Sequence, residues 1–265
     1  MIEFDDTADL GVLHTRRGRL DLALAHHAGS AAIAGGLGDH RLRAIALGGV
    51  GEVLHLQGRP AEAVERLTEA LSLLDGDAES IAPLNTLALA YRDLGHLDDA
   101  LRTARAAVGR AAGAATLTTL ATILLRLGDP GTALAHATDA QRLATAAHER
   151  IEASLTLTAI HTSLAQYDRA HPHARQALTL SEPGYRLLHG NAMTALATLH
   201  HCAGRPAEAH LHATRALQIH QETGHLPGEA QTHLILAHTA PGEFRAFHLR
   251  AAFTLFAQLG ANFRA

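Results

Sequence analysis

The sequence predicts an all-α protein, a solenoid of about seven antiparallel helix pairs stacked one after another. Three observations favour this fold. A turn-forming hexapeptide, Gly-Arg-Pro-Ala-Glu-Ala, occurs at residues 58–63 and returns unchanged at 204–209. Looser forms of it recur every 33 to 40 residues along the chain. The 265 residues are 47% hydrophobic but only 3% aromatic, so the core must consist mainly of Ala and Leu, which suits closely packed helices.

Each copy of the turn is expected to join two helices. Glycine readily takes the left-handed conformation just past a helix end, and proline fits the first turn of the next helix. Related turns begin at Gly18, Gly95 and Gly128, and Ala165 stands in the glycine position of another. The alanine that closes each turn lies on the second helix and marks the register of its unit. These markers are Ala23, Ala63, Ala100, Ala133, Ala170 and Ala209.

Small residues also occupy fixed places around each marker. Twelve to thirteen residues before it lies a close-packing pair such as Leu87-Ala88, and a larger side chain follows that pair three residues later. Helices approach closely where residues are small, and the larger side chains fill the space beside them. Seven residues after each marker comes Ser30, Ala70, Ala107, Ala140, Ala177 or Ala216.

This pattern resembles the tetratricopeptide repeat (TPR) family, in which a Leu-Gly pair, a Tyr-like residue and a glycine turn precede Ala…Ala on the second helix. The resemblance covers about residues 4 to 259 and implies a right-handed superhelix. It also implies a single repeat domain over residues 1–265, with units at about 4–38, 42–76, 81–112, 114–147, 151–183, 188–224 and 228–260. The long units are similar to the C-terminal TPR regions of bacterial antibiotic-type transcription regulators and signalling ATPases.

The resemblance further implies a non-enzymatic module that binds a protein or peptide segment, which could be another domain of the same regulator. In that family the first helix of each unit lines a concave groove. Arg92 and Arg126 could pair there with a carboxylate. The sequence leaves open whether the chain is a region of a larger regulator or a free-standing adaptor. The groove positions that the resemblance selects are Glu52, His55, Asn85, Arg92, Thr118, Thr119, Thr122, Arg126, Thr156, Thr162, Asn191, Thr194, Thr198 and His201.

Composition excludes several kinds of chemistry. All 22 basic residues are arginine, whereas phosphate-binding P-loops, Schiff-base enzymes and protein kinases need a lysine. The chain has neither a Gly-x-Ser-x-Gly nucleophile turn nor a His-Glu-x-x-His zinc motif. We therefore predict no enzyme activity, no catalytic residues and no cofactor. A net charge of −4 favours neither nucleic acid nor an anionic membrane as a partner.

The predicted location is the cytoplasm. The chain has a single cysteine, Cys202, which cannot form an internal disulfide and is expected to be a structural thiol. The acidic first six residues lack the basic start and apolar run of a signal peptide. No uncharged apolar stretch reaches the length of a membrane-spanning helix.

Histidine supports an alternative function, a histidine-rich solenoid that binds a metal or a small molecule. The 21 histidines include local groups at 26–27, 171 and 173, 200–201 and 210 and 212. Residues one or two apart on a helix point in different directions, whereas zinc sites on helices use ligands three or four apart. We therefore assign no metal ligand and expect His14, His161 and His200 to replace core aromatic residues.

The last unit is rich in phenylalanine. Phe244, Phe247, Phe253 and Phe256 lie within it, and Phe263 follows. An end unit has a face without a neighbour, so these side chains are expected either to pack the terminal unit or to mediate self-association.

Overall fold

The computed structural model describes residues 2–74, 78–182 and 184–260, and these contain fourteen α-helices, one 3₁₀ turn and no strand. The all-α prediction is therefore confirmed. The helices are α1 (Ile2–Arg16), α2 (Leu20–Gly36), α3 (His40–Leu56), α4 (Pro60–Ser72), α5 (Ile81–Asp93), α6 (Leu97–Arg110), α7 (Ala114–Arg126), α8 (Pro130–Leu143), α9 (Ala147–Ser163), α10 (Tyr167–Ser181), α11 (Arg186–Cys202), α12 (Pro206–Thr223), α13 (Leu226–Thr239) and α14 (Gly242–Gln258).

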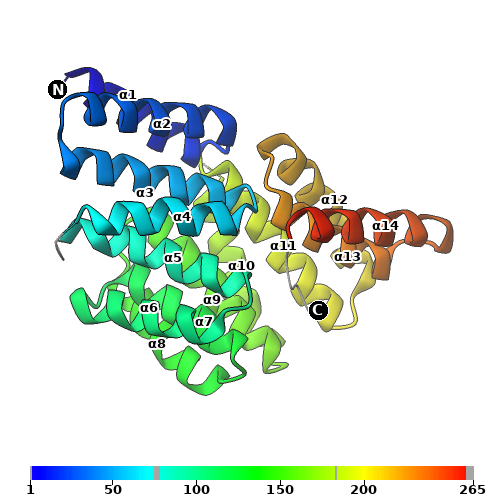
Figure 1. The fold of residues 1–265 in the computed structure, drawn as a ribbon. Helices are drawn as coiled ribbons and strands as arrows, with labels where there is room; N and C mark the ends of the chain where they lie inside the picture. The colour runs from blue at the N-terminus through cyan, green and yellow to red at the C-terminus, as the bar shows by residue number, and fades with distance from the viewer. Residues whose placement is uncertain (1, 75–77, 183, 261–265) are drawn as a thin grey trace.

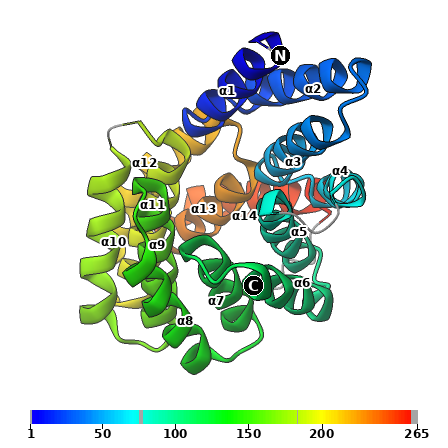
Figure 2. The ribbon, with the colours of Figure 1, turned by 90° about the vertical axis from the view of Figure 1, so that its left-hand side faces the viewer.

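The helices follow one another as antiparallel pairs around a superhelix (Figure 1). Each helix packs against the next, and the odd-numbered helices also pack against one another from pair to pair. The odd-numbered helices consequently form the inner face of the superhelix, while the even-numbered helices α2 to α12 lie outside them (Figure 2).

The turn chemistry and the small residues explain the pairing. All six marker alanines, and all six small residues that follow them by seven positions, have no exposed surface. Gly18, Gly58, Gly95, Gly128 and Gly204 have φ between 70° and 82°, a range that glycine reaches without strain. The repeated turn thus orients each helix pair as the sequence predicts.

Ala165 is the exception among these turns, because a non-glycine residue there has a φ of 55°. A left-handed conformation costs an L-residue roughly 1–2 kcal/mol, and the extra entropy of glycine in the unfolded chain offsets part of that cost. We expect Ala165→Gly to raise the free energy of unfolding by about 1 kcal/mol, measured by urea titration. Gly128→Ala, at a φ of 82° with nothing within 4 Å of the added methyl, should lower it. Destabilisation by both substitutions would contradict this explanation.

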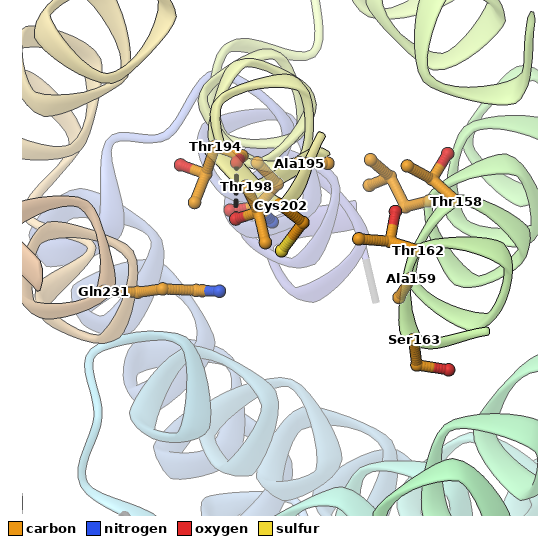
Figure 3. A pocket seen from close by; sticks show the side chains of 11 residues that line it. Thr158, Ala159, Thr162, Ser163, Thr194, Ala195, Thr198, Cys202 and Gln231 are labelled. Atoms are coloured by element: carbon orange, nitrogen blue, oxygen red, sulfur yellow. Dashed lines mark hydrogen bonds between the residues drawn. The ribbon is translucent and has the colours of Figure 1, made fainter. Parts of the chain in front are cut away.

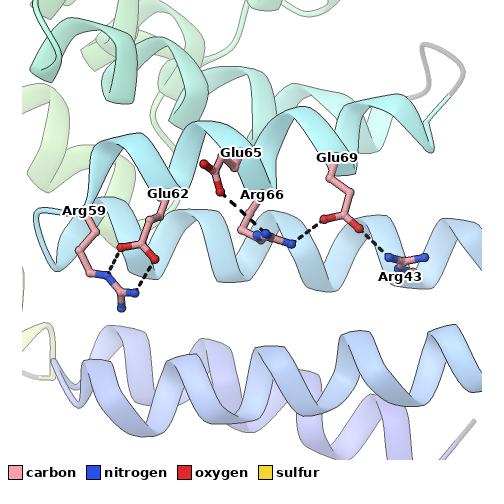
Figure 4. A network of polar contacts seen from close by, with 6 residues as sticks. All are labelled: Arg43, Arg59, Glu62, Glu65, Arg66 and Glu69. Atoms are coloured by element: carbon pink, nitrogen blue, oxygen red, sulfur yellow. Dashed lines mark hydrogen bonds and ion pairs between the residues drawn. The ribbon is translucent and has the colours of Figure 1, made fainter.

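An ion-pair network covers the outside of the second helix pair (Figure 4). Arg59, the second residue of the hexapeptide, contacts Glu62 at 2.7 Å. Glu69 accepts from Arg66 at 2.8 Å and from Arg43 on α3 at 2.5 Å. Exposed ion pairs each contribute little to stability, at most about 1 kcal/mol. The network therefore orients the charged side chains on the outer surface, whereas helix pairing depends mainly on the buried alanine contacts.

The superhelix brings its two ends together. Leu20, Val53 and Leu187 form one buried apolar cluster, although they come from α2, α3 and α11. A Cβ added to Gly18 would lie 2.4 Å from Thr223, and one added to Gly58 would lie 3.2 Å from Pro227. The turns of the first two helix pairs thus contact the last two pairs.

Candidate functional site

A pocket of about 410 Å³ lies on the inner face between α9 and α11 (Figure 3). It contains four of the predicted groove residues, and every residue that lines it is uncharged. Gln231 reaches it from α13, on the opposite side from Thr162 and Ser163. We call this site the threonine pocket. Its lining residues are Leu155, Thr158, Ala159, Thr162, Ser163, Asn191, Thr194, Ala195, Thr198, Cys202 and Gln231.

Helical spacing places the threonines in the pocket. Thr158 and Thr162 are one turn apart on α9, and Thr194 and Thr198 are one turn apart on α11, so each pair shares a helix face. Thr158 donates to the Ser154 carbonyl at 2.8 Å and Thr198 to the Thr194 carbonyl at 2.9 Å. These hydroxyls are therefore already used on their own helices.

Thr162 is different, because its buried hydroxyl has no hydrogen-bond partner within the described ranges. The side-chain amides of Asn191 and Gln231 likewise make no hydrogen bond to other described residues. Buried polar groups normally have partners, whereas this hydroxyl, which has almost no exposed surface, lacks one. The pocket thus combines an unpartnered hydroxyl and two amides with a mainly apolar wall.

Thr194 belongs to a buried network and does not offer its hydroxyl to a ligand. Only 5% of Thr194 is exposed, and its hydroxyl donates to the Gly190 carbonyl at 3.1 Å. Its oxygen lies 2.9 Å from Nε2 of His220, which has no exposed surface. Burial lowers the pKa of His220 to about 4, so the imidazole is neutral at pH 7. The network joins α11 to α12 and reaches Thr232 on α13 at 3.2 Å.

His55 and Arg92 come together at a second place on the inner face, around Asp93. Nε2 of His55 lies 2.8 Å from one carboxylate oxygen, and Arg92 donates to the other at 2.8 Å. Burial opposes ionisation of Asp93, but Arg92 and His55 outweigh it and hold the pKa of this carboxyl below its ordinary range. Arg92 is thus already paired within the protein, which weakens the expectation that it binds a carboxylate of a partner.

Glu52 lines a separate hollow of about 210 Å³, which we call the acidic pocket. Desolvation by the neighbouring helices raises the pKa of Glu52, although the charges of His55 and Arg16 act in the opposite direction. Burial raises the pKa of Glu152 to about 7, with the charges of Glu52 and Glu149 acting in the same direction. The acidic pocket is lined by Val12, Thr15, Arg16, Glu52, Leu56, His148, Glu152, Tyr185, Leu187 and Leu188.

The remaining predicted residues are dispersed. Asn85 and Thr118 each have a buried side-chain oxygen without a partner among the described residues. Thr119 and Thr156 are only 6% and 5% exposed, so neighbouring helices cover most of their surface. The Thr122 hydroxyl donates to the Thr119 carbonyl at 2.8 Å. Arg126 is exposed at the end of α7, and His201 stacks on His238 of α13 at 5.2 Å.

Three chemically important residues that line the threonine pocket or the acidic pocket were not predicted from the sequence. Gln231 lies in the unit whose turn departs from the repeat, so the register offered no marker for it. Glu152 could not be linked to Glu52, which is distant in sequence. Cys202 was expected to be a structural thiol, but this residue is exposed and lines the threonine pocket. For Cys202 the i+4 spacing from Thr198 was an available signal.

The histidines form stacked pairs within single units. His161 stacks on His173 with centroids 5.7 Å apart, and His200 stacks on His212 at 5.4 Å. His14 and His26 repeat this arrangement at 5.2 Å in the first unit. In each pair, the first histidine holds the large-residue position on the first helix of the unit. The second histidine lies three residues after the marker alanine on the second helix. Over the described part of the chain, no group of three or more His, Cys, Asp or Glu residues could hold a metal ion.

The phenylalanines of α14 face solvent for the most part. Phe244, Phe247 and Phe253 are 53%, 56% and 65% exposed, so the last unit does not bury them. Phe263 lies outside the described residues. Self-association through this helix stays a prediction. None of the described helices is long and apolar enough to span a membrane.

Comparison with protein families identifies the fold. Profiles described as tetratricopeptide repeat match residues 5–76, 82–106, 114–137 and 190–223, which together make up more than half of the sequence. The chain belongs to the tetratricopeptide repeat family. Proteins of this family generally act as non-catalytic scaffolds that mediate contacts between proteins. No curated protein matches the sequence of this TPR protein.

Solved structures share the fold at low sequence identity. A Rap protein complexed with Competence and Sporulation Factor has a TM-score of 0.78 at 15% identity, over 98% of this TPR chain and 76% of that one. A chain of the APC/C hetero-tetramer Cut9-Hcn1 gives a TM-score of 0.64 at 19% identity, over 90% of this chain and 43% of that one. A thermophilic TPR protein from Thermus thermophilus gives 0.54 at 22% identity, over 77% and 96%. At these identities the likeness establishes the fold of the TPR chain.

Proposed function

We propose that this TPR protein binds an extended, uncharged segment of a peptide or protein in the threonine pocket. The observation that carries the proposal is the unpartnered Thr162 hydroxyl in an uncharged pocket that the side-chain amides of Asn191 and Gln231 also line. Each side-chain amide presents a donor and an acceptor, which matches the N–H and C=O groups of an extended backbone. The threonine and alanine walls accommodate small side chains.

The absence of charge in this pocket favours a neutral segment. Burying an unpaired charge is costly, and no lining residue of the threonine pocket could compensate it. Arg92, at the second place on the inner face, is paired with Asp93. We therefore propose that recognition depends on backbone hydrogen bonds and apolar contact, and that a partner's carboxylate contributes little here.

We further propose that the TPR chain serves as the sensor or regulatory region of a bacterial transcription or signalling regulator. The long repeat units support this assignment, as does the shared fold with a Rap protein complexed with Competence and Sporulation Factor. The partner is then a peptide or another domain of the regulator.

Peptide selection tests the binding site directly. A phage-displayed peptide library is panned on the immobilised protein, and enriched peptides are titrated calorimetrically against wild type and a Thr162→Val/Asn191→Leu double variant. Each lost hydrogen bond should cost about 1 kcal/mol, so affinity should fall at least roughly tenfold.

Thr138→Val is the matched control, because Thr138 is exposed on the outer helix α8 and should leave affinity unchanged. Enriched peptides that bind the double variant as tightly as wild type would disprove the site. Failure to enrich any peptide would contradict the proposed function itself.

A further inference from the structure

The two identical hexapeptides occupy different environments. In a solenoid each unit normally contacts only its neighbours, so a contact between distant units is additional to the repeat packing. A Cβ on Gly58 would lie 2.1 Å from Cδ2 of Leu259 and 3.2 Å from Pro227, both in the last unit. A Cβ on Gly204 would have nothing within 4 Å, although φ is nearly the same, 71° against 76°. Only the hexapeptide at residues 58–63 therefore contacts a distant unit.

The contact between the two ends is narrow. Its apolar part is the cluster around Leu20, Val53 and Leu187 together with the Gly58 contact. Two hollows adjoin it: the acidic pocket, which Leu187 lines, and a second hollow of about 300 Å³ lined by Leu20, Gln57, Gln221 and Glu222. The stabilisation that such a contact provides scales with the apolar area that it buries.

Two carboxylates and a neutral histidine lie at the joint. Glu52 on α3 and Glu152 on α9 face the same gap and repel each other when both are ionised. His225, at the start of α13, lies close enough to His55 and Asp93 for their charges to act on it. Burial, with His220 and His55, lowers the pKa of His225 to about 3, so it is neutral at this joint. Repulsion between the two carboxylates thus opposes the apolar contact across the gap.

We propose that the contact of Gly58 with Pro227 and Leu259 is a latch that holds the superhelix closed and that opens reversibly to widen its inner face. A residue with a Cβ at this position would adopt a strained positive φ and would displace the Leu259 side chain. Opening moves the last helix pair away from α3, and Gln231 on α13 moves with it relative to the first units. The proposal does not depend on whether the threonine pocket binds a peptide.

Distance measurement between spin labels tests the latch. In a Cys202→Ser background, nitroxides are placed on exposed Ala28 of α2 and exposed Ala246 of α14, and their separation is measured by double electron–electron resonance. Gly58→Ala should give a longer and broader distance distribution than the unsubstituted protein. Gly204→Ala carries the same left-handed strain without the contact and should leave the distribution unchanged.

Three outcomes would overturn the latch: no change in Gly58→Ala, equal broadening in both variants, or broadening in Gly204→Ala alone. If Gly58→Ala fails to fold, as judged by far-ultraviolet circular dichroism, Leu259→Ala replaces it. That substitution removes the contacting side chain without backbone strain. An unchanged distance in Leu259→Ala would equally overturn the proposal.

Discussion

Lowering the pH from 7 to 5 is expected to reduce the free energy of unfolding by about 2 kcal/mol through His220 alone. This imidazole has no exposed surface, and its pKa is lowered to about 4 by burial. In the unfolded chain it returns to the ordinary value near 6.5. Between these two values the unfolded state binds more protons, so stability is complete above pH 6.5 and falls as pH decreases towards 4.

The hydrogen bonds around His220 explain why protonation is unfavourable. Because the Thr194 hydroxyl donates to Gly190, its oxygen accepts from Nε2–H of His220. Nδ1 of His220 then accepts from Nδ1 of His225 at 3.2 Å. A second proton on His220 would meet the proton of His225, and Gly228 packs too closely for the ring to move. The two histidines consequently titrate as a pair.

Urea unfolding at pH 7, 6 and 5 measures this effect. His220→Gln should be less stable than wild type at pH 7 but should lose about 2 kcal/mol less on acidification. Glu152, whose pKa is raised to about 7, contributes in the opposite direction, but equally in both proteins. Parallel pH profiles for wild type and variant would show that His220 does not cause the acid sensitivity.

Leu67→Ala is expected to reduce the free energy of unfolding by about 2–5 kcal/mol. Leu67 is fully buried on α4 in a cluster with Val50, Leu54 and Leu87. The substitution removes apolar surface and leaves a cavity where three helices meet. Leu22→Ala, at a side chain 47% exposed on α2, should change stability by no more than about 0.5 kcal/mol.

Gly51 on α3 makes this prediction sharper, because its backbone makes room for the Leu67 side chain. A Cβ at Gly51 would lie 2.5 Å from Cγ of Leu67, so Gly51→Ala alone should cost roughly 1–3 kcal/mol through overpacking. In the double variant the added methyl enters the cavity left by Leu67→Ala. The combined loss should therefore be smaller than the sum of the two single losses. Additive losses in chemical denaturation would show that the two residues do not share this space.

Much of the fold could be predicted because the repeat is local. The spacing from Ala63 to Ala70 puts two small residues on one face of α4, and both are fully buried. The same register selected Thr162, Asn191 and Thr198, which the structure brings together in the threonine pocket. Helical periodicity and turn chemistry act over a few residues, so a single sequence is sufficient to assign them.

Tertiary structure alone decided which distant residues meet. The hexapeptide at Gly58 is identical in sequence to that at Gly204, yet only Gly58 lies against Leu259. Arg92 is paired with Asp93, which His55 also contacts, and Glu152 faces Glu52 from α9. These contacts depend on the curvature of the superhelix, which is the accumulated result of a small rotation at every junction between units. The turn and helix patterns of the sequence predict the rotation at each junction only approximately. The sum of these rotations over a full turn of the superhelix determines where the two ends meet.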